Sequence, residues 1–348
     1  MTLQLEAVCL QNFRCFDEHE LWVPLHSDLT VFVANNAQGK TAVLEGICHA
    51  VNPFVDILST EPKSEGITRD DVRRILNEQG NMDQQFPSVI RGRGTVVGSE
   101  IEWYRERTSV APRTRTRDTH SKPLRDLANA VAERLDEREV DLPVFAYYDA
   151  RRTASIPDDS DDIPLKQIPD RGTGYRGHLK PLFSFDKFVK WYGGLAWNIK
   201  KLKPAIDRIE FRPELHLAVV NDAVRQVLEP TGWCNLHWDY DLNRLMIENQ
   251  DRGRLPLSTM SDGVRNTISI VADIAHRCCR LNPQYASEAA RETAGVILID
   301  EVDLHLHPSW QQLVIGLLGA TFPKIQLVLT NHIPQHVLTS SNYVRCPS

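Results

Sequence analysis

The stretch VFVANNAQGKTAVLEGI, residues 31–47, constrains the fold more than any other part of the chain. It begins in an apolar run, LTVFVA (29–34), which is typical of a strand buried on both faces of a sheet. A short loop over 34–39 follows, and apolar residues at helical spacing then predict a helix from Lys40 to about Ala50. Strand, loop and helix in this order are the context that a phosphate-binding loop requires.

Such a loop binds phosphate because consecutive backbone N–H groups converge at a helix N-terminus, where the helix dipole adds positive potential. We expect Lys40 to reach the β- and γ-phosphates of a nucleotide and the Thr41 hydroxyl to hold Mg²⁺. Gly39 lets the backbone approach phosphate with no Cβ in between. Ala34 stands where the loop's first glycine is usual, and a small residue is the main requirement there.

A second segment, GVILIDE (295–301), is an apolar strand that ends in two carboxylates. In this arrangement Asp300 would belong to the Mg²⁺ shell, and Glu301 would orient or deprotonate the attacking water. An apolar strand with solvated acids at its end is the alternative. The phosphate loop, earlier in the same chain, favours the catalytic interpretation.

Two further motifs lie nearby in sequence. MSDGVRN (260–266) opens a helix, so Ser261 and Gly263 offer a second anion-binding end, suited to the γ-phosphate of a nucleotide held by another protomer. A simple N-cap is the alternative for Ser261. In LVLTNHIPQ (327–335), His332 follows an apolar strand, where it could contact the γ-phosphate or serve as an ordinary loop residue.

The remaining patterns predict a parallel sheet with helices on its faces and additional antiparallel strands. We expect a strand at 3–10, antiparallel strands over 86–108, and a buried strand at 142–150. A hairpin should turn near Leu242 and Asn243. Helices are predicted at 124–135, 183–203 and 213–228, and the Asp-, Pro- and Gly-rich segment 153–178 is predicted to be a flexible loop.

Composition excludes several classes of protein. The chain has 348 residues with 42% hydrophobic and 25% charged residues, which is typical of a globular protein. A net charge of −6 argues against adhesion of the whole surface to nucleic acid. No run approaches 18 apolar residues, and the N-terminus does not read as a secretory signal. Seven scattered cysteines without a C-x-x-C motif favour reduced thiols, so we expect a cytoplasmic protein with no membrane span.

The order of NFRCF (12–16), NAQGKT (36–41), SDG (261–263), LIDEVDLHLHP (298–308) and TNHIP (330–334) resembles the SMC/RecF-like branch of ABC-type ATPases. More narrowly, the chain resembles the AAA_21 ATPases of Septu-like and retron-linked antiphage modules and of OLD-like proteins. The resemblance extends over nearly the whole sequence. It implies an α/β P-loop NTPase fold of the ABC/SMC type, with a mixed sheet, an antiparallel β-subdomain and a helical insert.

The resemblance also assigns roles to individual residues. It implies ATP phosphates on Asn36, Ala37, Gln38, Gly39, Lys40 and Thr41, and Mg²⁺ on Thr41 and Asp300. Glu301 would be the catalytic carboxylate, His332 the switch histidine, and Arg14 an arginine near the nucleotide. Ser261 and Gly263 would contact the nucleotide across a dimer, and Asp303 would lie where the protomers communicate. The polar loop that senses Mg²⁺ is poorly marked, with Asp70 or Asp71 as candidates.

These expectations describe one ABC-type ATPase domain over 1–348. It would divide into an N-terminal lobe (1–60), a β-subdomain with a helical insert (61–255) and a C-terminal lobe (256–348). ATP would close a homodimer or higher oligomer, and hydrolysis would reopen it and signal to a nuclease or toxin partner in trans.

Two other functions stay open at the sequence level. A DNA-repair-type clamp would grip DNA through the basic run 105–125, although a solvated loop explains that run equally well. An ATP-binding scaffold with little turnover is suggested by Ala34 and by Asn331 and Ile333, which replace the threonine and serine that usually flank the histidine.

Overall fold

The computed structural model is organised around a five-stranded parallel sheet. It describes residues 3–34, 38–111, 116–135, 137, 139–150, 170–179, 185–202, 213–331 and 343–345. The strand order is β14-β3-β13-β12-β8, with bounds Tyr343–Arg345, Leu29–Val33, Ile325–Asn331, Gly295–Ile299 and Val144–Tyr148. All neighbouring strands are parallel. Every residue of β8, β12 and β13 is buried, as their continuous apolar runs predict.

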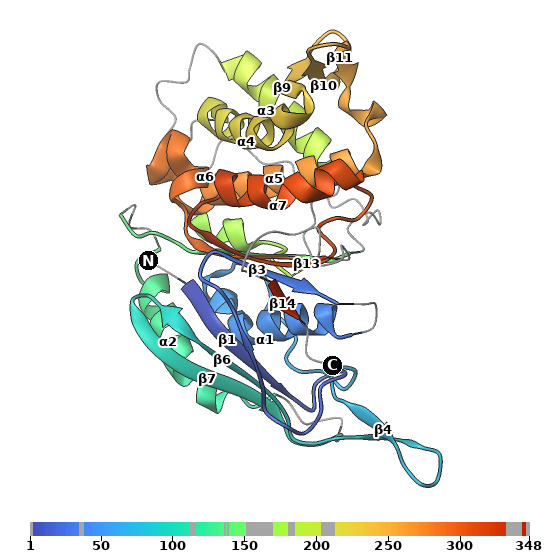
Figure 1. Ribbon diagram of the computed structural model, residues 1–348. Helices are drawn as coiled ribbons and strands as arrows, with labels where there is room; N and C mark the ends of the chain where they lie inside the picture. The colour runs from blue at the N-terminus through green and yellow to red at the C-terminus, as the bar shows by residue number, and fades with distance from the viewer. Residues whose placement is uncertain are drawn as a thin grey trace.

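Helices cover both faces of this sheet (Figure 1). Helix α1 (Lys40–Leu58) lies on one face, and α5 (Asp262–Leu281) and α7 (Pro308–Thr321) lie on the other. The predicted α/β fold with a parallel sheet between helices is therefore confirmed.

An antiparallel sheet packs on the far side of α1. Its order is β2-β1-β6-β7, with bounds Leu21–Pro24, Leu3–Gln11, Ser88–Val96 and Ser99–Arg107. The buried Gln326 of β13 links the two sheets: its amide accepts from the Leu5 N–H (2.9 Å) and donates to the Leu5 carbonyl (2.7 Å). The register of β1 shifts between Leu5 and Ala7, so this side-chain amide serves backbone groups at a bulge.

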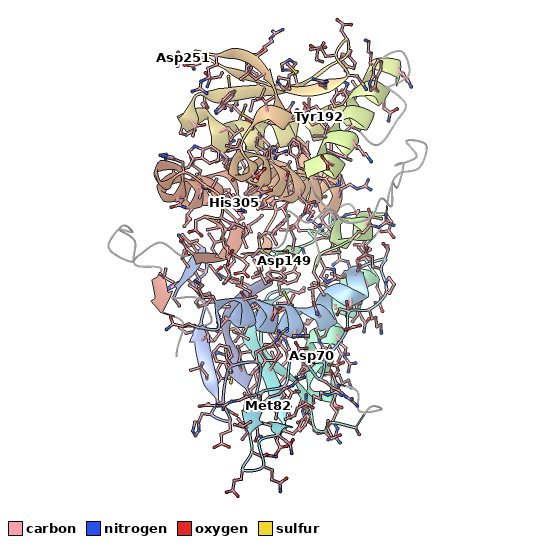
Figure 2. The ribbon with its side chains drawn as sticks, turned by 90° about the vertical axis from the view of Figure 1, so that its right-hand side faces the viewer. Asp70, Met82, Asp149, Tyr192, Asp251 and His305 are labelled. Carbon is pink, nitrogen blue, oxygen red and sulfur yellow. The ribbon has the colours of Figure 1, made fainter. Side chains whose placement is uncertain are left out.

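A third layer lies beyond α5. It contains α3 (Phe185–Leu202), α4 (Pro213–Leu228) and the sheet β11-β10-β9, with bounds Gly253–Pro256, Arg244–Asn249 and Trp233–Asp239. Met82 and Asp251 mark opposite ends of the molecule in Figure 2. The smaller elements are α2 (Lys122–Ala132), α6 (Ala289–Glu292), β4 (Arg74–Leu76) and β5 (Met82–Gln84).

Helix α1 is longer than the sequence predicts. We expected it to end near Ala50, but it continues through Pro53 to Leu58. A proline lacks the N–H that would bond to the carbonyl four residues earlier, here that of His49. The guanidinium of Arg105 donates to that carbonyl instead (3.0 Å). A distant strand thus supplies a donor to the carbonyl that Pro53 leaves without one.

The segment after residue 169 also differs from its prediction. Most of the expected loop 153–178 lies outside the described residues, but Arg171–Tyr175 forms a 3₁₀ helix with Tyr175 fully buried. The Arg171 guanidinium donates to the carbonyls of Leu281, Leu135, Glu137 and Val140. This one side chain hydrogen-bonds to the ends of several elements, so the end of the segment is part of the core.

By length and composition, α1 passes the test for a membrane-spanning helix. However, 72% of its most apolar window is buried inside the protein. Burial between two sheets explains its apolar character.

We predict that Arg105→Ala lowers the free energy of unfolding by about 2–4 kcal/mol, because it leaves the His49 carbonyl and the Asp118 carboxylate without their buried donor. Arg117→Ala is the matched control, since its side chain is 63% exposed, and should cost less than about 0.5 kcal/mol. Urea denaturation of both variants checks this. Equal, small losses of unfolding free energy in the two variants would show that the carbonyl freed by Pro53 needs no replacement donor.

We also predict that stability falls as the pH drops below about 6.5. His216 and His276 stack face to face at 4.7 Å between α4 and α5. Burial, together with the charge of Arg280, lowers the pKa of His216 from 6.5 to about 3. Burial likewise lowers the pKa of His276. The unfolded chain therefore takes up protons that the folded chain does not, between pH 6.5 and about 3. Denaturation midpoints across this range should show a shallower slope for His276→Phe, and an unchanged slope would contradict the assignment.

Candidate functional site

The end of the phosphate loop is tightly packed against the turn at residues 12–16. Gly39 has φ +84°, and a Cβ there would lie 2.8 Å from the Cys15 Sγ and 3.0 Å from Phe16 Cζ. Both the left-handed conformation and the lack of space require glycine. Gln38 precedes it in the described chain, whereas Asn36 and Ala37 lie outside the described residues.

Lys40 is buried at the first position of α1, and its ammonium lies between two strand ends. It donates to the Ala34 carbonyl (2.5 Å) and to the Asn331 carbonyl (3.3 Å). Both of these acceptors are backbone groups, which any residue supplies. These two hydrogen bonds therefore do not depend on the side chains of Ala34 and Asn331.

The predicted metal pair is brought together. The Thr41 hydroxyl donates to the Asp300 Oδ2 at 2.7 Å, joining the first turn of α1 to the end of β12. Asp300 is 2% exposed. Its other carboxylate oxygen accepts from the Thr330 hydroxyl of β13. A hydroxyl and a carboxylate are hard oxygen donors, the ligand type that Mg²⁺ prefers, so these residues fit the ion.

Thr330 organises the turn that carries Glu301, a role that the sequence analysis missed. Its hydroxyl accepts from the Glu301 N–H (2.7 Å), and its carbonyl accepts from the Val302 N–H (3.0 Å). Glu301 itself has φ +50°, which is uncommon for a residue with a Cβ. The bonds to Thr330 hold the predicted catalytic carboxylate in this turn.

Asp149 is a second residue that the sequence analysis missed. In the parallel register Ile299 pairs with Tyr148, so the next residues, Asp300 and Asp149, leave adjacent strands side by side. Burial and the nearby carboxylates of Asp300 and Asp149 raise the pKa of Tyr147. The strand was predicted, but only the sheet order reveals that its end joins the site.

Ser261 and Gly263 lie across the sheet from Lys40, because α5 and α1 cover opposite faces (Figure 1). Ser261 is exposed at the N-cap, and its side chain makes no capping bond. Gly263 is buried, and a Cβ there would lie 2.3 Å from the His305 carbonyl oxygen. Within one chain, Gly263 therefore lets the loop after β12 pack closely against α5.

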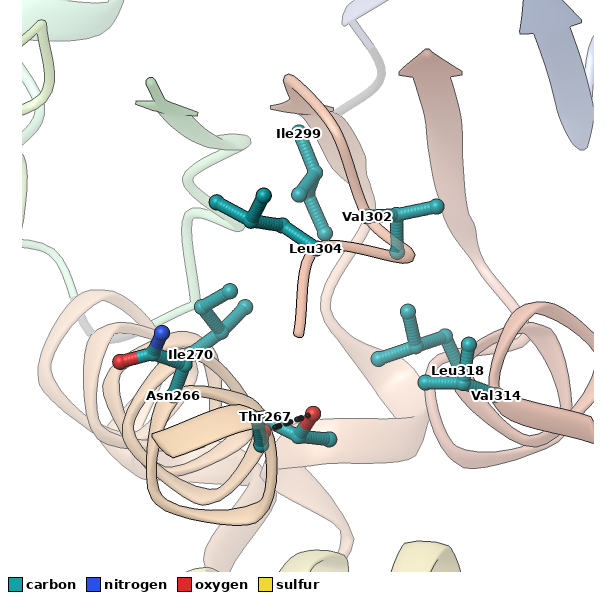
Figure 3. Close-up of a pocket in the computed structure, with 9 residues that line it drawn as sticks. Asn266, Thr267, Ile270, Ile299, Val302, Leu304, Val314 and Leu318 are labelled. Atoms are coloured by element: carbon teal, nitrogen blue, oxygen red, sulfur yellow. Dashed lines mark hydrogen bonds between the residues drawn. The ribbon is translucent and has the colours of Figure 1, made fainter. Parts of the chain in front are cut away.

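A small apolar cavity lies beneath this contact (Figure 3). Asn266, Thr267 and Ile270 of α5 face Leu304 of the loop and Val314 of α7 across it. Its volume of about 10 Å³ is roughly what one water molecule requires. It is too small to be the nucleotide site.

Arg14 lies in a turn with φ +54° and is held by two carboxylates. Its guanidinium is 2.9 Å from Glu45 and 2.8 Å from Asp71, and its N–H donates to the Asp71 carbonyl (2.7 Å). Burial opposes ionisation of Asp71, but hydrogen bonds from His49 and Thr68 hold its pKa below the usual range. Asp71, one of the two candidates for sensing Mg²⁺, contacts Arg14, and the other candidate, Asp70, is exposed.

The described part of the site is therefore one cluster at the carboxyl ends of the parallel strands, which is where sheets of this type bind ligands. It contains Lys40, Thr41, Asp149, Asp300 and Glu301. His332 lies outside the described residues.

Comparison with known proteins identifies the family and the fold. The AAA_21 family model, described as "AAA domain, putative AbiEii toxin, Type IV TA system", matches residues 29–337. The "Retron Vc95 probable ATPase" of Vibrio cholerae serotype O1 biovar El Tor is 23% identical over 385 residues, covering 95% of this chain and 71% of the relative. The Septu protein PtuA of Bacillus thuringiensis is 32% identical over 92 residues, 26% of this chain and 23% of the relative.

A solved structure extends the comparison to the fold. An Smc head domain with an extended coiled coil, bound to the C-terminal domain of ScpA derived from Pyrococcus furiosus, superposes with a TM-score of 0.53. The sequences are 12% identical, and the match covers 96% of this chain and 90% of that one. The family and the ABC/SMC-type fold that the motifs predicted are confirmed. The chain belongs to the AAA_21 family and has the fold of an Smc head domain.

Proposed function

We propose that this protein binds ATP with Mg²⁺ and hydrolyses it. The observation that carries the proposal is the hydrogen bond between Thr41 and Asp300, which joins the phosphate-loop helix to the acidic strand end. Two motifs separated by more than 250 residues meet at the atoms that the chemistry requires. The relatives named as probable ATPases support the same activity.

Each residue of the candidate site would have its own role in ATP binding and hydrolysis. Lys40 and the N-terminus of α1 would bind the β- and γ-phosphates. Thr41 and Asp300 would hold Mg²⁺, which supplies neutralisation of phosphate charge. Glu301, placed by Thr330, would orient the attacking water and accept its proton. Asp149 would fix a water or an outer ligand beside Asp300.

The exposed end of α5 supports a dimer formed around ATP. Ser261 keeps its hydroxyl for an external acceptor, and the helix N-terminus favours an anion. We propose that this end meets the γ-phosphate of a nucleotide held by a second copy. Gly263 would contribute by positioning α5 and the loop 301–307 together.

We further propose that the ATP-driven change of assembly switches a nuclease or toxin partner in antiviral defence, in the cytoplasm. The names of the retron and Septu relatives support the setting. The partner's identity would follow from what copurifies with the ATP-bound form.

The DNA-clamp alternative loses part of its support. Arg105 and Arg107, at the start of the basic run, are 4% and 7% exposed, and they donate to carbonyls of His49 and Ile67. These two side chains are structural and do not face phosphate. The scaffold alternative is decided by measuring turnover.

We predict that the wild-type protein releases phosphate from ATP in the presence of Mg²⁺ and that Glu301→Gln slows this at least about 100-fold without loss of ATP binding. The variant should accumulate as an ATP-bound dimer in light scattering. Binding without turnover by both proteins would establish a scaffold. A lack of binding by either would refute the nucleotide site.

We predict that Asp149→Asn lowers kcat about tenfold or more and changes KM little, because the carboxylate acts beside the metal ligand rather than on the bound nucleotide. Steady-state kinetics and a thermal midpoint would be measured together. An unchanged kcat at unchanged stability would remove Asp149 from the site.

A further inference from the structure

Arg14 is shared between two carboxylates that differ in how firmly they are fixed. Asp71 is 5% exposed in its side chain, and its Oδ2 accepts from both the N–H (2.8 Å) and the hydroxyl (2.7 Å) of Thr68. Its backbone carbonyl also accepts from the Arg14 N–H. Asp71 thus holds both the turn and the side chain of Arg14.

Glu45 holds Arg14 in a different way. Its side chain is 27% exposed and stands on α1 four residues after Thr41, so it projects from the same face of the helix one turn further on. An incoming triphosphate would approach this turn of α1. Arg14, 39% exposed, presents five donors and can exchange one anionic partner for another.

We propose that Glu45 and Asp71 are positioning residues with opposite effects on Arg14. Asp71 is a permanent anchor that keeps the guanidinium beside the phosphate loop. Glu45 is a competing partner that occupies the guanidinium until the nucleotide's phosphates replace it. The inference rests on the proposed ATP site, and it assigns to that site a built-in exchange of ion pairs.

The test measures ATP binding to the full chain by calorimetry without Mg²⁺, in the Glu301→Gln background. Asp71→Asn should weaken binding about tenfold, and Glu45→Gln should tighten it about three- to tenfold. Asp70→Asn is the matched control one residue away: its carboxylate is 87% exposed and pairs with Arg74, so the Kd should not change.

A second background separates the exchange from simple charge repulsion. In Arg14→Ala, both carboxylate substitutions should leave the Kd unchanged within about twofold, because their effect acts through the guanidinium. Tightening by Glu45→Gln that persists without Arg14 would overturn the proposal. So would loss or no change of affinity in Glu45→Gln with Arg14 present.

Thermal midpoints show whether each variant is still folded. Thr68→Val is a further test of the anchor: it removes a hydroxyl donor to Asp71 and should weaken ATP binding, as Asp71→Asn does. A neutral Thr68→Val at unchanged stability would count against the anchor. If the parent protein binds no ATP, the proposed function fails. If it binds ATP but the two carboxylates shift the Kd in the same direction, only this inference fails.

Discussion

The buried carboxylate of Asp300 is the constraint on which the rest of the site depends. Removing a carboxylate from water is costly unless hydrogen-bond donors replace the water. Thr41 and Thr330 supply those donors from two directions, one from the phosphate-loop helix and one from the neighbouring strand. The requirement to satisfy this one charge therefore fixes α1 and β13 relative to β12, and it places Lys40 at the same edge.

The sequence could predict those features whose determinants lie within the same short segment of the chain. Strands such as β12 and the helix that follows Gly39 are determined locally, by apolar runs and by a glycine that can take φ +84°. The end of α1 is not marked locally, because Pro53 removes one hydrogen bond of the helix and Arg105, 52 residues later, donates to the carbonyl that is left free. No pattern in the sequence of the helix indicates that donor.

The same distinction between local and distant determinants explains which residues of the candidate site could be predicted. Thr41, Asp300 and Glu301 belong to motifs whose spacing to a strand end is fixed, so they could be named from the sequence. Asp149 could not, because its place depends on β8 being the neighbour of β12 in the sheet order. Asp71 was considered for another role, and only the folded turn shows that it faces Arg14.

The positive groups of the candidate site have partners within the chain itself. The Lys40 ammonium rests on two backbone carbonyls, and Arg14 rests on two carboxylates. These interactions satisfy charges that would otherwise be unpaired in buried or partly buried positions, which stabilises the folded site. They also set the free energy that phosphate binding must exceed, since each new contact replaces an existing one. The carboxylates on Arg14 are where affinity can be adjusted without altering the phosphate loop.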